Sequence, residues 1–324
     1  MSDSGVIALT WFGHRRTESL CKKLGWTYWV IETRSRGLIR YLRLAPRTIF
    51  MIAWRKPRIL VVQNPSLVLT ALCLMFRPIF RYRLVVDAHN EAVQPFLFTS
   101  LPLRWISRRC LRGADMTIVT NNALASHVTS AGGTAFVLPD PLPDPPPENA
   151  GAEAHPRTTF KAAVISTFSA DEPLQEILRA ASRLVGTVEF KVTGSLQRLP
   201  KALREQAPRN VTFTGFLPES EYWALLRSCD VVVDLTLMPD CLVCGAYEAI
   251  AVQRPVIVTD SAAAKSWFRE AAIYVSNDAA SIERVLLQVM DRREYWMAKV
   301  AASALEIERA WEERGAALRS YLRR

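Results

Sequence analysis

The chain has 324 residues, of which 50% are hydrophobic and 22% are charged, and its formal net charge is +10. This length accommodates two domains, and the composition excludes a disordered or collagen-like protein. The longest nearly uncharged apolar run, residues 67–76, is much shorter than the roughly 20 residues of a membrane-spanning helix.

Short β-branched segments alternate with helix-length segments along the whole chain, which is typical of βαβ units and parallel sheets. In the first half, strands are predicted at residues 6–10, 27–31, 59–63, 84–87, 116–120 and 135–138. The second half repeats the pattern, with strands predicted at residues 162–166, 189–193, 211–214, 231–235, 255–258 and 273–275. We therefore predict an α/β protein with two Rossmann-like parallel-sheet domains that face a central cleft.

A proline-rich segment, PDPLPDPPPENAGAEAHPRT, separates the two halves. Proline lacks the backbone N–H that helices and sheets use, so this segment reads as a linker. The predicted divisions are a first domain at residues 1–142, a linker at 143–158, a second domain at 159–300 and a C-terminal helix at 301–324. We expect this helix to pack back toward the first domain.

The excess positive charge lies in the first half of the chain. Residues 1–150 hold 19 Lys+Arg and 9 Asp+Glu, a net of +10, whereas residues 151–324 hold 22 of each. This asymmetry predicts an anionic partner for the first domain. A basic surface that only aids solubility is the alternative.

The first predicted strand is followed by a turn that contains a single glycine, Gly13, and by a helix that begins near His14 and Arg15. A dinucleotide fingerprint needs three glycines, and neither this turn nor the turn at Gly194 has them. Nicotinamide and flavin chemistry is therefore disfavoured.

Residues 37–58 and 72–83 combine bulky apolar side chains with arginines. This composition is typical of segments that lie on an anionic membrane, although Pro46 interrupts the first of them. Helices that bury their apolar faces in the core and extend arginines into water are the alternative. With no secretory signal and six scattered cysteines, we expect a cytoplasmic protein that is peripheral on the inner face of the cytoplasmic membrane.

Polar turns follow two adjacent predicted strands of the first half. They contain the candidate residues Asn64, Asp87, His89, Asn90 and Glu91. Ligands of open parallel sheets bind outside the carboxyl ends of the strands, so these side chains are candidates for the reacting edge. An imidazole with a pKa of about 6.5 suits proton acceptance. One of the two acids is the other candidate base, and a structural role for the histidine is the alternative.

The strand at residues 162–166 leads into the turn STFSADE, which offers hydroxyl and N–H groups to a diphosphate. The acids of this turn, Asp171 and Glu172, alternatively stabilise only the N-terminus of the next helix. The candidate phosphate contacts of this half are Ser166, Thr167, Gly194, Arg198 and Lys201.

The most informative segment is MPDCLVCGAYEAIAVQRPVIVTD, residues 238–260. Asp240 precedes Glu248 by eight positions, and Gly245 permits a close approach of the backbone between them. A helix that begins near Cys244 and Gly245 can stabilise an anion, and a carboxylate can accept hydrogen bonds from neighbouring hydroxyls. The alternative is that Asp240 is a turn residue and Glu248 a surface charge.

This segment resembles the donor-site signature of family-4-type GT-B glycosyltransferases: an acid, seven residues, a glutamate, an alanine-rich helix and a PVI strand. It departs from that pattern in having Asp240 in place of glutamate and Gln253 in place of the glycine before the strand. VVQNPSLVLTAL, LVVDAHNEA and STFSADE are similar to motifs of the dolichol-pathway β-1,4-mannosyltransferase (chitobiosyldiphosphodolichol β-mannosyltransferase) family.

The resemblance implies a GT-B fold whose first domain binds the acceptor and whose second domain binds a nucleotide sugar. Glu248 would hold the ribose, Asp240 the transferred sugar, and the helix end at Cys244 and Gly245 the phosphates. His89 would contact the transferred sugar. The residues implied on the acceptor or phosphate side are Gly13, His14, Arg15, Asn64 and Asn90.

We therefore expect a metal-independent hexosyltransferase that uses a UDP- or GDP-sugar and no other cofactor. The expected acceptor is a hydroxyl of a glycan or polyprenyl-diphosphate-linked glycan in cell-surface polysaccharide synthesis, with no nucleic acid and no obligate protein partner. Stereochemistry stays open, because the donor site resembles retaining enzymes and the N-terminal motifs resemble an inverting family. The alternatives are a nucleotide-sugar epimerase or phosphorylase of the same fold, or a non-catalytic basic adaptor on a membrane surface.

Overall fold

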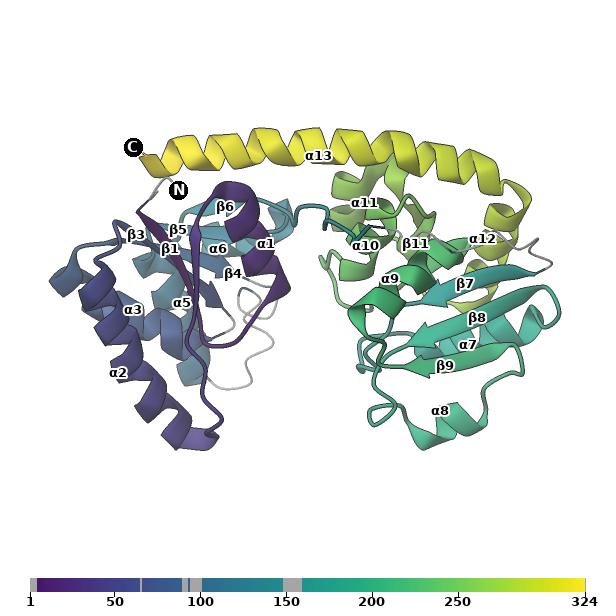
Figure 1. Ribbon diagram of the computed structural model, residues 1–324, viewed down its shortest axis with the longest axis horizontal. Coiled ribbons are helices and arrows are strands. Elements are labelled where there is room, and N and C mark those ends of the chain that lie inside the picture. The colour runs from purple at the N-terminus through teal and green to yellow at the C-terminus, as the bar shows by residue number, and fades with distance from the viewer. Residues whose placement is uncertain (1–4, 65, 89–92, 94–100, 148–158, 324) are drawn as a thin grey trace. The chain divides into compact units, whose positions relative to one another are not determined.

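The computed structural model describes residues 5–64, 66–88, 93, 101–147 and 159–323. The chain divides into two units: unit 1 comprises Met1–Pro141 and Ala310–Arg324, and unit 2 comprises Leu142–Arg309. Each unit contains a six-stranded parallel sheet with helices packed against it (Figure 1).

The sheet of unit 1 has the strand order β2-β1-β3-β4-β5-β6, and every neighbouring pair is parallel. Its strands are β1 (Val6–Thr10), β2 (Thr27–Val30), β3 (Ile59–Asn64), β4 (Arg83–Ala88), β5 (Met116–Val119) and β6 (Ala135–Val137). Its helices are α1 (Arg15–Leu24), α2 (Gly37–Arg55), α3 (Leu67–Phe80), α5 (Leu101–Gly113) and α6 (Asn122–Ser130). Because parallel crossovers are right-handed, α1 lies on one face of the sheet, and α2, α3, α5 and α6 lie on the opposite face.

The last part of α13 (Arg293–Arg323) packs on unit 1. The indole N–H of Trp311 donates to the Pro139 carbonyl at 2.9 Å, and a guanidinium N–H of Arg83 donates to the Leu322 carbonyl at 3.2 Å. The free carbonyls at the end of this helix thus meet a cation, which stabilises a helix C-terminus.

The sheet of unit 2 has the strand order β12-β11-β10-β7-β8-β9, again with parallel neighbours. Its strands are β7 (Phe160–Val164), β8 (Val188–Thr193), β9 (Val211–Gly215), β10 (Val231–Asp234), β11 (Val256–Thr259) and β12 (Ile273–Val275). Its helices include α7 (Leu174–Arg183), α8 (Lys201–Glu205), α9 (Glu219–Ser228), α10 (Cys244–Ala251), α11 (Ala262–Phe268), the short 3-10 helix η2 (Arg269–Ala271) and α12 (Ala279–Asp291).

The central strands are buried along most of their length, as expected of parallel strands covered on both faces. Every residue of β1 and of β10 is buried, whereas the edge strand β2 is partly exposed. The predicted α/β fold with two parallel sheets is confirmed, and each predicted strand is present with its ends shifted by at most two residues. None of the helices in the described ranges is long and apolar enough to cross a bilayer.

Candidate functional site

Four acidic side chains gather where β7 and β10 of unit 2 end. Asp234 is the last residue of β10, Asp171 and Glu172 follow β7, and Glu248 lies on α10. Burial and, to a smaller extent, charge repulsion from the three other acids raise the pKa of Asp234. This edge of the sheet therefore has an acidic rim.

Asp234 is 9% exposed, and its Oδ2 accepts a hydrogen bond from the Gly245 N–H at 2.7 Å. Burial raises the pKa of this carboxyl to about 8, the Gly245 N–H opposes the shift, and the neighbouring acids add to it. Asp234 is thus largely protonated at neutral pH, which lowers the negative charge of the rim.

Gly245 is required by this contact. A Cβ at position 245 would lie 2.5 Å from Asp234 Oδ2 and 2.9 Å from the Ile165 Cγ1. One of the backbone N–H groups at the start of α10, which we predicted to bind phosphates, is therefore already bonded to Asp234. Cys244, which precedes Gly245 as the first residue of α10, is exposed.

Glu248 lies one turn further along α10, on the same face as Cys244 and Gly245, because residues three and four apart share a helix face. The side chain is half-buried, and its Oε2 accepts a hydrogen bond from the Tyr222 hydroxyl of α9. A neighbouring helix thus orients the carboxylate at the helix N-terminus, where we predicted the ribose contact.

The loop after β7 binds its own carboxylate. Glu172 accepts hydrogen bonds from the Thr167 N–H at 2.8 Å, the Phe168 N–H at 3.0 Å and the Thr167 hydroxyl at 2.7 Å, and from the Ser166 hydroxyl. Successive N–H groups aimed at one anion form a backbone nest. The groups of Ser166 and Thr167 that we predicted to bind a diphosphate donate to Glu172 in this structure, and their contact with a diphosphate stays a prediction.

Gly194 permits the end of β8 to approach this loop. Its φ is +129°, and a Cβ there would lie 2.5 Å from the Ser166 carbonyl oxygen and 2.8 Å from the Phe168 ring. The structure therefore gives Gly194 a packing role.

The predicted cations do not join the acidic rim. Lys201 lies on α8, where its side chain is 89% exposed and pairs with Glu205 at 3.6 Å. Arg198 is exposed in the loop after β8. Asp240 lies between β10 and α10 with a φ of +57°, a left-handed conformation that aspartate tolerates in turns.

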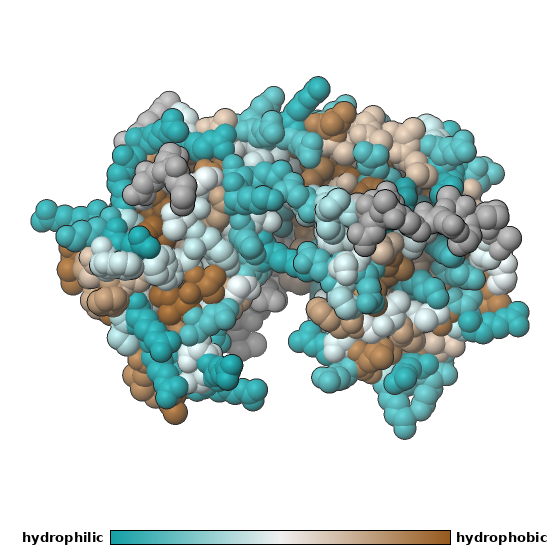
Figure 2. Space-filling view, viewed as in Figure 1, coloured by the Kyte–Doolittle hydropathy of each residue, from teal (hydrophilic) through white to brown (hydrophobic). Residues whose placement is uncertain are grey.

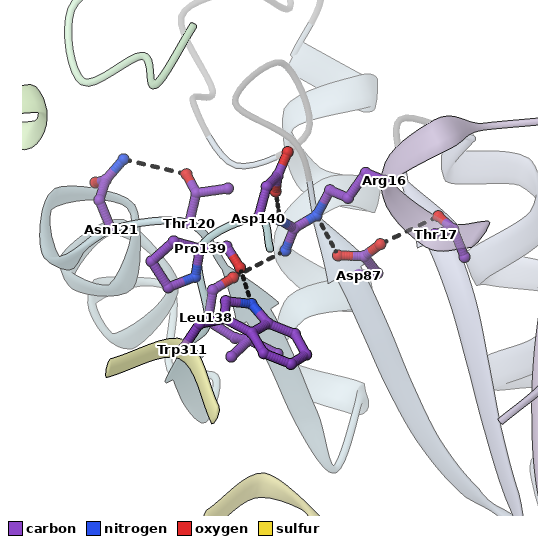
Figure 3. A network of polar contacts seen from close by, with 9 residues as sticks. All are labelled: Arg16, Thr17, Asp87, Thr120, Asn121, Leu138, Pro139, Asp140 and Trp311. Atoms are coloured by element: carbon purple, nitrogen blue, oxygen red, sulfur yellow. Dashed lines mark hydrogen bonds and ion pairs between the residues drawn. The ribbon is translucent and has the colours of Figure 1, made fainter. Parts of the chain in front are cut away.

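In unit 1, the buried carboxylate of Asp87 belongs to a polar network (Figure 3). The Arg16 Nε donates to Asp87 Oδ1 at 3.0 Å, and the Thr17 hydroxyl donates to Oδ2 at 3.2 Å. Arg16 also donates to the Leu138 carbonyl at 3.0 Å and pairs with Asp140. These contacts tie α1 to β4 and to the segment after β6, which favours a structural role for Asp87; its role as the acceptor base stays a prediction.

Four further predicted residues of unit 1, Gly13, His14, Arg15 and Asn64, lie at the carboxyl edge of its sheet, at the ends of the neighbouring strands β1 and β3. The Gly13 N–H donates to Glu32 Oε1 at 3.0 Å, and the His14 N–H donates to the Tyr28 hydroxyl at 3.0 Å. Burial lowers the pKa of the His14 imidazole. The side chain of Arg15 is exposed, and Asn64 ends β3 opposite Ala88. His89, Asn90 and Glu91 lie outside the described residues.

Sequence reasoning missed Asp234, Tyr222 and the internal role of Glu172. The signal for Asp234 was its position as a polar residue that directly follows three valines in a buried strand. No three His, Cys, Asp or Glu side chains in the described ranges are arranged to hold a metal ion.

Residues 160–292 match the family described as Glycosyl transferases group 1. No curated protein matches the chain. Among solved structures, HepE of Anabaena in complex with UDP and glucose superposes with a TM-score of 0.72 at 13% identity, covering 95% of this chain and 98% of HepE. The sucrose-phosphate synthase of Thermosynechococcus elongatus gives 0.76 at 16% identity and covers 98% of each chain.

The N-terminal domain of the trehalose-6-phosphate phosphatase of Candida albicans gives a TM-score of 0.72 at 11% identity, covering 98% of this chain and 96% of that chain. The chain has the GT-B fold. At these identities the likeness establishes the fold alone. The similarity to the dolichol-pathway family stays a prediction.

The pKa of Asp234 leads to a pH-dependent effect of Asp234→Asn on stability. The pKa of the Asp234 carboxyl is about 8 in the folded protein and 3.8 ordinarily. Between pH 4 and pH 8 this carboxyl therefore ionises in the unfolded chain but stays protonated in the folded one, and the free energy of unfolding of the wild type falls as pH rises. Asparagine does not titrate and still offers an oxygen to the Gly245 N–H. We expect the thermal midpoint of the variant, relative to the wild type, to rise between pH 5 and pH 8.

Asp278→Asn is the matched control, because the N–H of Ser281 lowers the pKa of this exposed cap residue. A carboxyl whose pKa is lowered in the folded protein stabilises that protein at pH values above its unfolded pKa. The thermal midpoint of Asp278→Asn, relative to the wild type, should therefore not rise between pH 5 and pH 8. Parallel unfolding curves for the wild type and Asp234→Asn across the same pH range would contradict a neutral Asp234.

Proposed function

We propose that the protein is a glycosyltransferase that transfers a hexose-type sugar from a UDP- or GDP-sugar to an acceptor hydroxyl. The observation that carries the proposal is the placement of Glu248 on the first turns of α10, inside the segment that matches Glycosyl transferases group 1. A structural relative solved with UDP and glucose supports this donor class.

In this proposal, Glu248 accepts hydrogen bonds from the ribose hydroxyls, and Asp240 contacts the sugar. The diphosphate lies at the N-terminus of α10, whose partial positive charge stabilises an anion. The rim can tolerate the diphosphate because Asp234 is largely neutral and because Glu172 is held by its own loop.

The acceptor oxygen attacks C1 of the donor sugar, the bond between C1 and the phosphate oxygen breaks, and the nucleoside diphosphate leaves. The hydroxyl proton passes to a base, for which His89 and Glu91 stay the candidates. Since Asp87 is held by Arg16 and Thr17, we assign it no proton transfer. We propose that the reaction needs no metal ion.

For the acceptor, we propose a glycan or a polyprenyl-diphosphate-linked glycan of cell-surface polysaccharide synthesis, used at the inner face of the cytoplasmic membrane. The excess positive charge of residues 1–150 supports an anionic, lipid-linked acceptor on this unit.

Calorimetric titration with UDP and with GDP tests the donor site, and we expect one of them to bind. Donors are then screened against lipid extracts, with and without EDTA, for release of the matching nucleoside diphosphate. An epimerase or phosphorylase would convert the donor without any acceptor hydroxyl, with free phosphate in the second case. A chain that binds neither nucleotide would favour the non-catalytic adaptor and contradict the proposal.

A further inference from the structure

Helix α2 is apolar on two opposite faces. Its inner face is buried in the core of unit 1 through Leu44, Thr48, Met51 and Ile52. At 100° per residue, an outer face opposite to it carries the exposed apolar side chains of Ile39 (57% exposed), Leu42 (66%) and Phe50 (71%), and Leu38 (73%) lies at the margin of that face. A surface helix ordinarily turns a polar face outward, so packing within unit 1 does not account for this one.

The neighbouring helices continue the apolar surface. Helix α3 packs beside both α2 and α5, in the layer that covers one face of the sheet. Figure 2 shows brown side chains along this margin of unit 1. We call the following set the docking face: Leu38, Ile39, Leu42 and Phe50 of α2, Val68, Met75 and Ile79 of α3, and Leu101 and Trp105 of α5.

The charge on the helices of the docking face is positive, and of its arginines Arg77 of α3 pairs with a carboxylate, that of Asp115, at 2.7 Å. No acidic residue occurs between Glu32 and Asp87, nor within α5. On α2, Arg43 donates to the Ser35 hydroxyl at 2.7 Å and Arg47 to the Glu32 carbonyl at 3.3 Å, so neither meets a carboxylate in these contacts. The arginines therefore keep their charge at the border of an apolar surface.

We propose that the docking face binds the surface of an anionic lipid bilayer. Apolar side chains with a basic border match the acyl boundary and the headgroups of such a bilayer. A second copy of the chain would bring two basic faces together, and like charges at an interface oppose binding. Nucleic acid would use the arginines and leave the apolar side chains in water.

The topology gives this surface an orientation. The first turns of α2, α3 and α5 follow the carboxyl ends of strands in a parallel sheet, and they carry Leu38, Val68 and Leu101. The same edge carries Gly13 and Asn64. The bilayer would thus lie next to the acceptor edge of unit 1. The docking face stands on its own, whereas its role in presenting a lipid-linked acceptor rests on the proposed function.

The test is co-sedimentation of the full chain with phosphatidylcholine vesicles that contain or lack phosphatidylglycerol. We expect binding only with the anionic lipid. Ile39→Ser/Phe50→Ser and Arg43→Glu/Arg47→Glu should each lower the partition coefficient at least about tenfold, because the first pair removes apolar area that the bilayer would bury and the second reverses two charges near an anionic surface. Both variants change exposed side chains, and both should keep the nucleotide affinity of the wild type, which separates this test from that of the donor site.

The matched controls lie in unit 2, where Leu305 is 58% exposed and Arg204 and Arg209 are also exposed. Leu305→Ser and Arg204→Glu/Arg209→Glu should leave vesicle binding within about twofold of the wild type. The proposal would be overturned if the wild type did not co-sediment with anionic vesicles, or if the docking-face variants co-sedimented with them as strongly as the wild type. A dimer seen by light scattering that both docking-face variants dissociate would assign the face to a second copy instead.

Discussion

Glu248→Ala should lower the affinity for the donor nucleotide by about 100-fold or more. A hydrogen bond to a charged group contributes about 1.5–3 kcal/mol, and the proposed carboxylate accepts two of them from neighbouring ribose hydroxyls. The side chain is half-buried on α10 beside the N-terminal turn of the helix, so its loss removes a ligand contact and leaves the core intact. Calorimetric titration of the variant with UDP and GDP measures the change.

Tyr222→Phe separates a ligand contact from a merely structural role of Glu248. In the structure the Tyr222 hydroxyl donates to Glu248. If the carboxylate served only to hold Tyr222, the phenylalanine variant would lose as much affinity as Glu248→Ala, and the ribose assignment would be wrong. We expect instead that Tyr222→Phe costs less than about tenfold, because the carboxylate remains. Glu221→Ala, on the exposed side of α9, is the matched control for loss of one acid.

The fold was predictable because its signal is repeated. Strands such as β10 are continuous runs of β-branched residues, and a strand covered on both faces by helices needs such a run. The proline-rich segment after Leu138 separates two halves that have the same alternation of strand and helix segments. The local sequence patterns of successive strands and helices were thus all consistent with one α/β fold, which could be predicted without knowledge of any long-range contact.

The site was predictable only in part, because side-chain partners depend on distant segments. Ser166 and Thr167 were recognised as anion-binding groups, but the anion they meet is Glu172 of the same loop. Asp87 has the sequence position of a catalytic acid, but the side chain that it meets belongs to Arg16, 71 positions away in the sequence. The local sequence shows which groups are able to bind an anion or a cation. The fold determines which side chain or ligand comes into contact with them.

Asp87→Ala should destabilise unit 1 by about 3–5 kcal/mol. The side chains of Arg16 and Asp87 are 3% and 0% exposed, and removing one partner of a buried pair destabilises the other charge, which here keeps only the partly exposed Asp140 as a carboxylate partner. Lys265→Ala is the control, since Lys265 and Asp260 form an exposed pair whose loss should cost no more than about 1 kcal/mol. Chemical denaturation followed by circular dichroism measures both.

Turnover of Asp87→Ala alone cannot distinguish a structural from a catalytic aspartate, because unfolding also abolishes activity. The double variant Arg16→Met/Asp87→Leu does so. Replacing a buried ion pair with apolar side chains of similar volume is often neutral for stability, and Asp140, whose side chain is 21% exposed, can be hydrated once Arg16 is gone. We therefore expect the double variant to recover most of the lost stability and to transfer sugar at a rate near that of the wild type. A double variant that is stable but inactive would contradict the structural assignment and make Asp87 the candidate base in place of His89 and Glu91.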